Sequence, residues 1–235
     1  MLEFFFPSQC FNCGIAKNRQ TNPIGFFCFA CQGKIKINRW LFCPVCNKKI
    51  PLGRQSCPSH SSPLTCLGIM GFYADPILKQ AIWKYKYEFI EELGLPLANL
   101  LFEYFQQSFA PKLKPGKKTW LISFIPLAKK RERWRGFNQA EFLAGNLSQK
   151  TGLDLKKTLV RAKFKKPQMR LKNKAERLAN IQNCFRIINP EAIKNKNIIL
   201  VDDISASGAT LQEAAKILKQ GKAKRVFGLV LARNS

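Results

Sequence analysis

Two adjacent aspartates, Asp202 and Asp203, are the residues of this sequence whose placement says most about chemistry. They follow a short apolar run, 197–201, that suits a fully buried strand. Adjacent carboxylates repel each other, so such a pair needs a compensating partner. The 2′ and 3′ hydroxyls of a ribose could donate to the two carboxylates, and one carboxylate could help to hold Mg²⁺ on a pyrophosphate. The alternative is that both residues only cap a turn.

The segment after the aspartates has the composition of a phosphate-binding loop. It consists of hydroxyl and small residues: Ser205, Ala206, Ser207, Gly208, Ala209 and Thr210. A helix is predicted over 209–219, and the free N–H groups and dipole of a helix N-terminus attract anions. Gly208 would let the backbone approach a phosphate closely. We therefore expect 199–210 to form a loop that binds a phosphorylated ribose, with the two aspartates as the candidate catalytic pair.

The cysteines indicate metal sites. Eight of the nine lie within residues 10–66, and in a chain that we expect to stay in the cytoplasm, clustered Cys-x-x-Cys pairs are typical of metal ligands. The first set is Cys10, Cys13, Cys28 and Cys31, and the second is Cys43, Cys46, Cys57 and His60. Both sets match tetrahedral zinc sites of the structural kind. Free buried thiols are the alternative.

His60 leaves the second metal set open. It is the only histidine of the chain, and it stands where a fourth ligand is needed, but Cys66 could replace it. A closed site with four protein ligands does no chemistry, so we expect structural zinc. A region with so few core residues should unfold without its metal.

The charge of the chain points to a polyanionic partner. With 40 basic and 14 acidic residues, the net charge is +26. A lysine-rich composition without functional meaning is the alternative. Two basic segments stand out: 129–136, which could also be a solvated charged turn, and 156–177, which we expect to be a long mobile loop.

From Leu67 onward the sequence alternates helical and strand patterns, which predicts an α/β domain with a mostly parallel sheet. The expected strands are 120–126, 197–201 and 225–231, and the expected helices are 76–108, 138–149 and 209–219. Gly94 and Pro96 could divide the first helix. We expect two domains, 1–66 with the metal sites and 67–235 with the sheet. No apolar run is long enough to span a membrane, and no secretory leader is evident.

The segment Ile198–Thr210 resembles the motif with which type I phosphoribosyltransferases bind phosphoribosyl pyrophosphate (PRPP). Over nearly its full length the sequence resembles the ComF family, of the ComFC type linked to bacterial natural transformation. The stretches most specific to that family are Ile125-Pro126-Leu127 and Arg135-Gly136-Phe137-Asn138-Gln139-Ala140-Glu141. The paired cysteines resemble the family's N-terminal double zinc ribbon. The sequence departs from the family at Ala206, where a hydroxyl residue is common.

The resemblance implies a type I phosphoribosyltransferase-like parallel sheet with helices on both faces, preceded by a small zinc-ribbon module. It implies that PRPP binds with magnesium, and that Lys130, Arg131 and Arg135 contact the pyrophosphate, because guanidinium forks match phosphate oxygens. It also implies a role in DNA uptake, with single-stranded DNA and a competence helicase as partners. Trp134 and Phe164 could stack on bases, whereas Phe137 is better explained as core.

An enzyme is the alternative to a binding protein. Such an enzyme would transfer the phosphoribosyl group of PRPP to a nitrogenous base in nucleotide salvage. The sequence contains no pocket for a base that we can identify, so it favours recognition of PRPP over transfer. A regulator that responds to PRPP is a third hypothesis.

Overall fold

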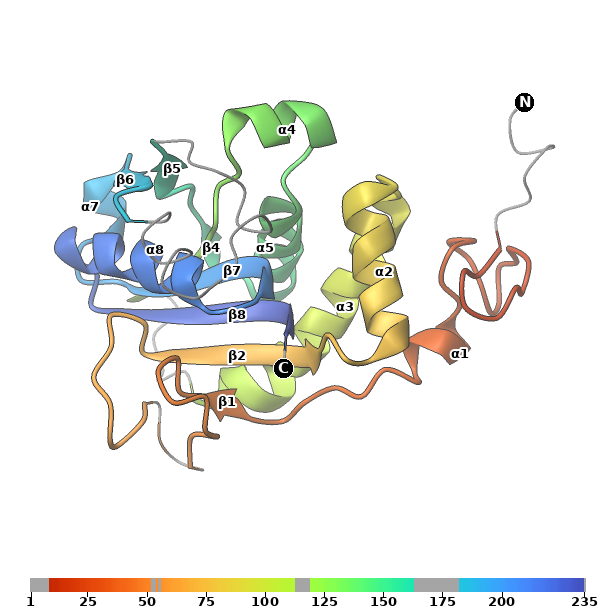
Figure 1. Ribbon diagram of the computed structural model, residues 1–235, viewed down its shortest axis with the longest axis horizontal. Coiled ribbons are helices and arrows are strands. Elements are labelled where there is room, and N and C mark those ends of the chain that lie inside the picture. Colours follow the sequence, from red (N-terminus) through yellow and green to blue (C-terminus); the bar gives the residue numbers. More distant parts are fainter. Residues whose placement is uncertain (1–8, 52–53, 55, 113–118, 163–181, 235) are drawn as a thin grey trace.

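The structure is a computed structural model that describes residues 9–51, 54, 56–112, 119–162 and 182–234 of the 235-residue chain. Its centre is a six-stranded sheet in the order β1-β2-β8-β7-β3-β4 (Figure 1). All neighbouring strands are parallel except β1, which is antiparallel to β2. The strands are β1 Leu41–Phe42, β2 Cys66–Phe72, β3 Trp120–Phe124, β4 Asp154–Leu155, β7 Asn197–Ser205 and β8 Arg225–Arg233.

Helices cover both faces of the sheet, which confirms the predicted fold class. One face packs against α2 Pro76–Tyr87, α3 Gly94–Tyr104 and α5 Gln139–Thr151, and the other packs against α8 Ala209–Gln220. The alternation of side chains along β7 explains the two layers. Ile199 and Val201 belong to the core under the first group of helices, whereas Ile198 and Leu200 belong to the core under α8.

Smaller elements complete the chain. A two-stranded antiparallel sheet, β5 Leu159–Arg161 and β6 Phe185–Ile187, packs near α8. The short helical elements are α1 Phe29–Gln32, η2 Glu91–Leu93, η3 Phe105–Phe109, η4 Ala110–Lys112, α4 Lys129–Arg135 and α7 Pro190–Ile193. Most of the basic segment 156–177 lies outside the described residues, and its described part includes β5. Within the part of the chain that is described, no helix has the length and apolar character needed to cross a membrane.

The long helix predicted over 76–108 is interrupted earlier than Pro96. Asp75 caps α2 by accepting the N–H groups of Ile77 and Leu78, and the chain leaves the helix through Phe89, whose φ is 56°. Gly94 then starts α3, which places Pro96 in the first helical turn. Proline is tolerated there because the first N–H groups of a helix have no partner within the helix.

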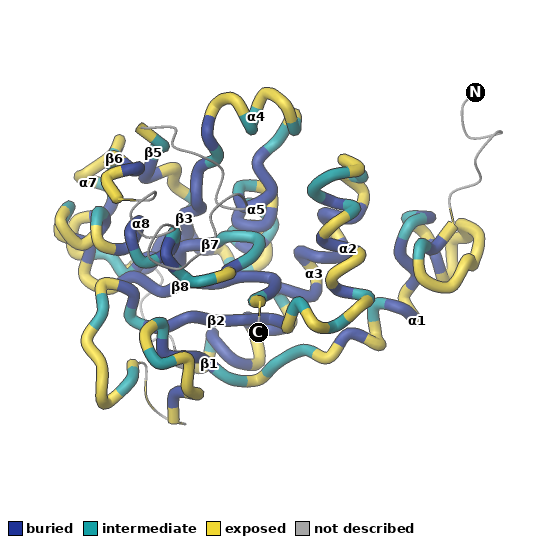
Figure 2. The backbone as a smooth tube through the Cα atoms, in the orientation of Figure 1, coloured by how far each residue is buried: buried dark blue, intermediate teal, exposed yellow. Residues whose placement is uncertain are grey.

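The basic segment 129–136 is not the solvated charged turn that the sequence left open as an alternative. Residues Lys129–Arg135 form α4, which ends at Gly136 with a φ of 78°. Lysine, arginine and glutamate are good helix formers, and glycine in the left-handed conformation ends helices. No residue of α4 is buried, and Figure 2 shows its outer side exposed. Without a buried face, the helix has no hydrophobic period that the sequence could reveal.

The loop predicted over 199–210 is shorter in the structure. Strand β7 continues to Ser205, because its backbone pairs with β8 as far as Arg233. Main-chain pairing does not depend on the polarity of the side chains, so a strand can include two aspartates. Only 206–208 separates β7 from α8.

The segment before β2 is joined to the sheet at several points. Strand β1 pairs with β2, and the N–H of Asn38 donates to the carbonyl of Met70 at 2.7 Å. The Tyr104 hydroxyl donates to the carbonyl of Trp40 at 2.7 Å and accepts the N–H of Ile69 at 3.1 Å. In Figure 1 the segment that ends in α1, residues 9–32, lies on the side of the molecule where α2 and α3 lie, away from β1. The division of the chain into domains at residue 66 stays a prediction.

Candidate functional site

A cavity of about 320 Å³ lies at the carboxyl ends of β3 and β7. Ligands of open α/β sheets bind at this edge. Six of the predicted PRPP-site residues line the cavity: Arg131, Arg135, Asp202, Asp203, Ala206 and Thr210. Lys130 is exposed on α4 and does not line it. The other predicted residues do not belong to the lining: Ser205 ends β7, Ser207 and Gly208 lie in the turn that follows, and Ala209 begins α8.

The two aspartates have different surroundings. Lys86 Nζ, at the end of α2, lies 2.8 Å from Asp203 Oδ2, and both side chains are nearly buried. Asp202 Oδ1 accepts the N–H of Asp203 at 2.9 Å. Burial, together with repulsion from Asp203, raises the pKa of Asp202 to about 8. Lys86 is therefore the compensating partner of Asp203, and Asp202 is largely protonated at neutral pH.

Three arginines crowd the same cavity. Burial and repulsion from Arg161 and Arg135 lower the pKa of Arg131. Arg135 Nη1 donates to Gln139 Oε1 at 3.1 Å, and its guanidinium lies 5.4 Å from the centre of the Tyr87 ring. The Nε atoms of Arg135 and Arg161 are buried and have no hydrogen-bond partner among the residues that the structure describes. Crowded cations with unpaired donors are an arrangement that favours an anionic ligand.

The turn between β7 and α8 adds backbone donors. Gly208 has a φ of 76°, a conformation that residues with a Cβ rarely adopt. The α8 helix begins at the next residue, so its first N–H groups are free to bind an anion. Ser205 Oγ is buried without a hydrogen-bond partner in the described part of the chain. Ser207 Oγ is used within the turn, where it accepts the N–H of Ala209 at 3.5 Å.

The second cysteine set is tied to this same helix. Gln212, in the first turn of α8, donates from Nε2 to the carbonyl of Pro44 at 3.1 Å. Its Oε1 accepts the hydroxyl of Ser62 at 2.8 Å. Both partners lie in the segment that carries the second set, so that segment helps to position α8 and its N-terminal turn.

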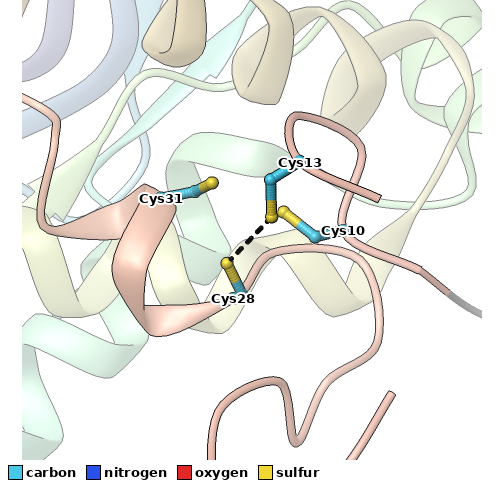
Figure 3. A group of neighbouring side chains, drawn as sticks. All are labelled: Cys10, Cys13, Cys28 and Cys31. Carbon is cyan, nitrogen blue, oxygen red and sulfur yellow. Dashed lines mark hydrogen bonds between the residues drawn. The ribbon is translucent and has the colours of Figure 1, made fainter. Parts of the chain in front are cut away.

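The first cysteine set has the geometry of a metal centre. The Sγ atoms of Cys10, Cys13, Cys28 and Cys31 all lie within 4.8 Å of one another and point toward a common centre (Figure 3). Cys13 and Cys28 have their sulfurs 3.5 Å apart, close to the edge of about 3.8 Å of a tetrahedral zinc-thiolate site. Burial raises the pKa of Cys28 and raises that of Cys31 to about 12. At Cys10 burial is outweighed by N–H groups of Cys28, Asn12 and Cys13, which lower its pKa to about 6. The set can therefore hold a zinc ion.

The second set is completed by His60. Its Nδ1 atom lies 3.4 Å from Cys57 Sγ and 3.8 Å from Cys43 Sγ, and the four ligand atoms of the set lie within 4.8 Å of one another. Cys66, the alternative ligand, is buried at the start of β2, where it pairs with Phe227. These positions favour a site with three cysteines and one histidine.

Sequence reasoning missed several residues beside the cavity. Lys86, Arg161, Tyr73, Tyr87 and Asn234 also line it. Lys86 and Tyr87 come from α2, which is far from the aspartates in sequence. Only the fold brings them there, so no local pattern could have shown their position.

The rings of Trp83, Tyr87 and Phe89 were also missed, whereas Trp134 was among the residues expected to stack on bases. Trp83 and Tyr87 have ring centres 6.0 Å apart, and Phe89 and Trp134 have theirs 5.2 Å apart. Trp134 is 60% exposed and Trp83 is 47% exposed. The spacing of four residues between Trp83 and Tyr87 on one helix was a usable signal. Phe137 instead packs on Tyr85, with ring centres 5.3 Å apart, and lies against the core, as expected. Phe164 lies outside the described residues.

Comparison with known proteins gives a consistent result. A family model for the phosphoribosyl transferase domain matches residues 135–235. Competence protein ComFC of Bacillus subtilis (strain 168) is 29% identical, over 88% of this chain and 84% of that protein. Competence protein F of Haemophilus influenzae is 28% identical, over 92% and 93% of the two chains. DNA utilization protein YhgH of Escherichia coli (strain K12) is 24% identical, over 88% and 96%.

These matches place the chain in the ComF family. The family predicted from the motifs is thus confirmed. A solved structure titled "Structure of the allosteric regulatory enzyme of purine biosynthesis" aligns with 59% of this ComF-family chain and 26% of its own, at 14% identity and a TM-score of 0.39.

We expect the ComF-family chain to bind two zinc ions, one for each set. Cys28→Ser and Cys57→Ser should each reduce the zinc content from about two to about one per chain, because a tetrahedral site that loses one of its four ligands binds metal weakly. Zinc in the purified protein can be measured by atomic emission. Cys184→Ala, which changes a cysteine outside both sets, is the control and should leave the content unchanged. A full zinc content in Cys28→Ser would contradict the first site.

The protonation of Asp202 gives a second prediction. Its pKa is raised from 3.8 to about 8, so between these pH values the folded protein holds a proton that the unfolded chain has lost. The free energy of unfolding therefore falls as pH rises through this window. Asp202→Asn cannot ionise, and we expect its gain in melting temperature over the wild type to increase from pH 6 to pH 8.5, without magnesium. An equal difference at both pH values would contradict the raised pKa.

Proposed function

We propose that this ComF-family protein binds PRPP together with Mg²⁺ in the cavity at the ends of β3 and β7. One observation carries the proposal: two adjacent carboxylates and three arginines line the same cavity of about 320 Å³. PRPP has the matching groups, a ribose with two hydroxyl donors and a pyrophosphate with several negative charges. The matched phosphoribosyl transferase domain supports the same assignment.

Each part of the ligand has a partner in this proposal. Asp202 and Asp203 accept the ribose hydroxyls, and the turn 206–210 binds the 5′-phosphate with its backbone N–H groups. The guanidinium groups of Arg131, Arg135 and Arg161 contact the pyrophosphate. Carboxylate and phosphate oxygens are the ligands that Mg²⁺ prefers, and when bound it would neutralise part of the pyrophosphate charge.

In the free protein, Lys86 would occupy the place beside Asp203 that a ribose hydroxyl takes in the complex. In the structure it neutralises Asp203 at 2.8 Å. A ribose hydroxyl that donates to Asp203 would compete with this ion pair, so Lys86 would be released toward the phosphates. Asp203 is thus charge-compensated before PRPP binds.

We expect Asp203→Asn to weaken PRPP binding about 10- to 100-fold. A hydrogen bond to a charged group contributes about 1.5–3 kcal/mol, and 1.4 kcal/mol is a factor of ten in affinity. Isothermal titration of the zinc-loaded protein with PRPP and Mg²⁺ measures the effect. Asp154→Asn removes an exposed carboxylate on β4 and is the matched control. Wild-type affinity in Asp203→Asn would refute the proposed role of the carboxylate pair.

The same protein preparation tests whether PRPP is also a substrate. With Mg²⁺, PRPP and a mixture of nucleobases, release of pyrophosphate would favour phosphoribosyl transfer and nucleotide salvage. Binding without release for every base would favour recognition, either in DNA uptake or as a regulator that responds to PRPP.

We further propose that the surface beside the cavity binds single-stranded DNA. Trp83, Tyr87, Phe89 and Trp134 present aromatic rings there, and Arg135 lies within 6.0 Å of the Trp134 ring centre. Aromatic platforms next to basic residues bind single strands by stacking and by charge. Two relatives are named for competence and one for DNA utilization. The protein would then act in the cytoplasm on incoming DNA, with a competence helicase as a partner.

Trp134→Ala should weaken binding of a fluorescent oligothymidine about 5- to 150-fold, because stacking contributes about 1–3 kcal/mol per base. Ile188→Ala, which removes an exposed apolar side chain elsewhere, should have no effect. The affinity should also fall steeply as salt concentration rises, because bound phosphates release counterions. Fluorescence anisotropy at several salt concentrations measures both effects. An affinity that does not depend on salt would contradict an electrostatic contribution.

A further inference from the structure

A second cavity of about 320 Å³ lies between α2, η2, α4 and the start of α5. Aromatic and acidic side chains line it, together with the turn that follows α4. The lining residues are Tyr85, Glu91, Glu132, Gly136, Phe137, Asn138, Glu141 and Phe142. Asn138 also lines the candidate PRPP cavity, so the two cavities are neighbours. Nothing in the proposed function uses this second cavity.

The acidic residues of this cavity are unexpected in a basic protein. The chain has 40 basic and 14 acidic residues, yet Glu91, Glu132 and Glu141 line one small space. None of the three side chains makes an ion pair or hydrogen bond with any other residue that the structure describes. Three negative charges that face one space without a cationic partner give it a potential that attracts a bound cation.

Tyr85 gives an independent sign of a ligand. Its side chain is fully buried and lines the cavity, and its hydroxyl has no hydrogen-bond partner among the described residues. Buried hydroxyls in folded proteins are nearly always hydrogen-bonded, because an unpaired one costs stability. A ligand with a donor or acceptor in the cavity would supply the missing partner.

The walls of the cavity favour an organic cation over a metal ion. The ring centres of Phe137 and Phe142 lie 5.3 and 6.4 Å from that of Tyr85, and aromatic faces attract organic cations. A metal ion needs several oxygens around one point. The ligand atoms of each cysteine set lie within 4.8 Å of one another, whereas the three glutamates do not form such a group in the described chain. Separated carboxylates fit a ligand with separated positive ends.

We propose that this cavity binds a short aliphatic di- or triamine. The ammonium ends donate to the glutamates and to the Tyr85 hydroxyl, and the methylene groups between them pack on Phe137 and Phe142. The proposal does not depend on PRPP binding, because the two cavities have separate ligand groups. An occupant would contact Glu132 on α4 and the turn at Gly136, and would therefore steady the helix that carries Arg131 and Arg135.

Isothermal titration of the full-length, zinc-loaded protein with spermidine tests the proposal. We expect one saturable site, and Glu141→Gln should weaken it at least tenfold. Glu92→Gln is the matched control, because it removes the same charge beside Glu91 in η2 without changing a residue that lines the cavity. Equal weakening by Glu92→Gln would show general attraction to acidic residues and would overturn the proposal. So would the absence of a saturable site, or full competition by an equal concentration of Mg²⁺.

Tyr85→Phe separates a ligand contact from a structural role. The substitution removes only the unpaired hydroxyl, so the melting temperature of the free protein should rise, by about 2–4 °C for each kcal/mol relieved in a chain of this size. Its affinity for spermidine should nevertheless fall several-fold. If Glu141→Gln fails to fold, this variant decides the question, and wild-type affinity in Tyr85→Phe would overturn the proposal. Neither outcome requires PRPP to bind.

Discussion

The pairing of β7 with β3 on one side and β8 on the other is the interaction on which the candidate site depends. Five backbone pairs join β7 to β3, and the pairing with β8 continues through Asp202 to Ser205. This pairing holds two adjacent carboxylates at the carboxyl edge of the sheet, where free side chains would repel each other. It also determines where α8 begins, and so where the free N–H groups of that helix lie.

Charge compensation then organises the surroundings of that edge. Asp203 is neutralised by Lys86 from α2, and Asp202 is kept protonated by burial and by its neighbour. Arg131, Arg135 and Arg161 stand in the same cavity with guanidinium groups that repel one another. Asp203 is compensated without a ligand, whereas the arginines would gain from an anionic one. The second cavity, beside α4, instead has an excess of acidic side chains. Asn138 lines both cavities.

The cysteine sets contribute at a distance from this edge. Cys10, Cys28 and Cys31 belong to the core that underlies α2 and α3. The segment with the second set holds α8 through Gln212 and contributes β1 to the sheet. Metal ligation in these segments would therefore be coupled to the packing of the larger part of the chain.

The sequence by itself determined the fold class, the family and the two candidate metal-ligand sets, with His60 and Cys66 left as alternatives in the second set. These features follow from local spacing: the cysteine pairs, the apolar runs of β3, β7 and β8, and the Asp-Asp segment before a helix. Tertiary structure alone decided the length of β7, because its extension depends on backbone pairing with β8. It also decided the helical form of α4, which has no buried face, and the ion pair between Lys86 and Asp203. That contact joins residues 117 positions apart, and only the packing of α2 against the sheet brings them together.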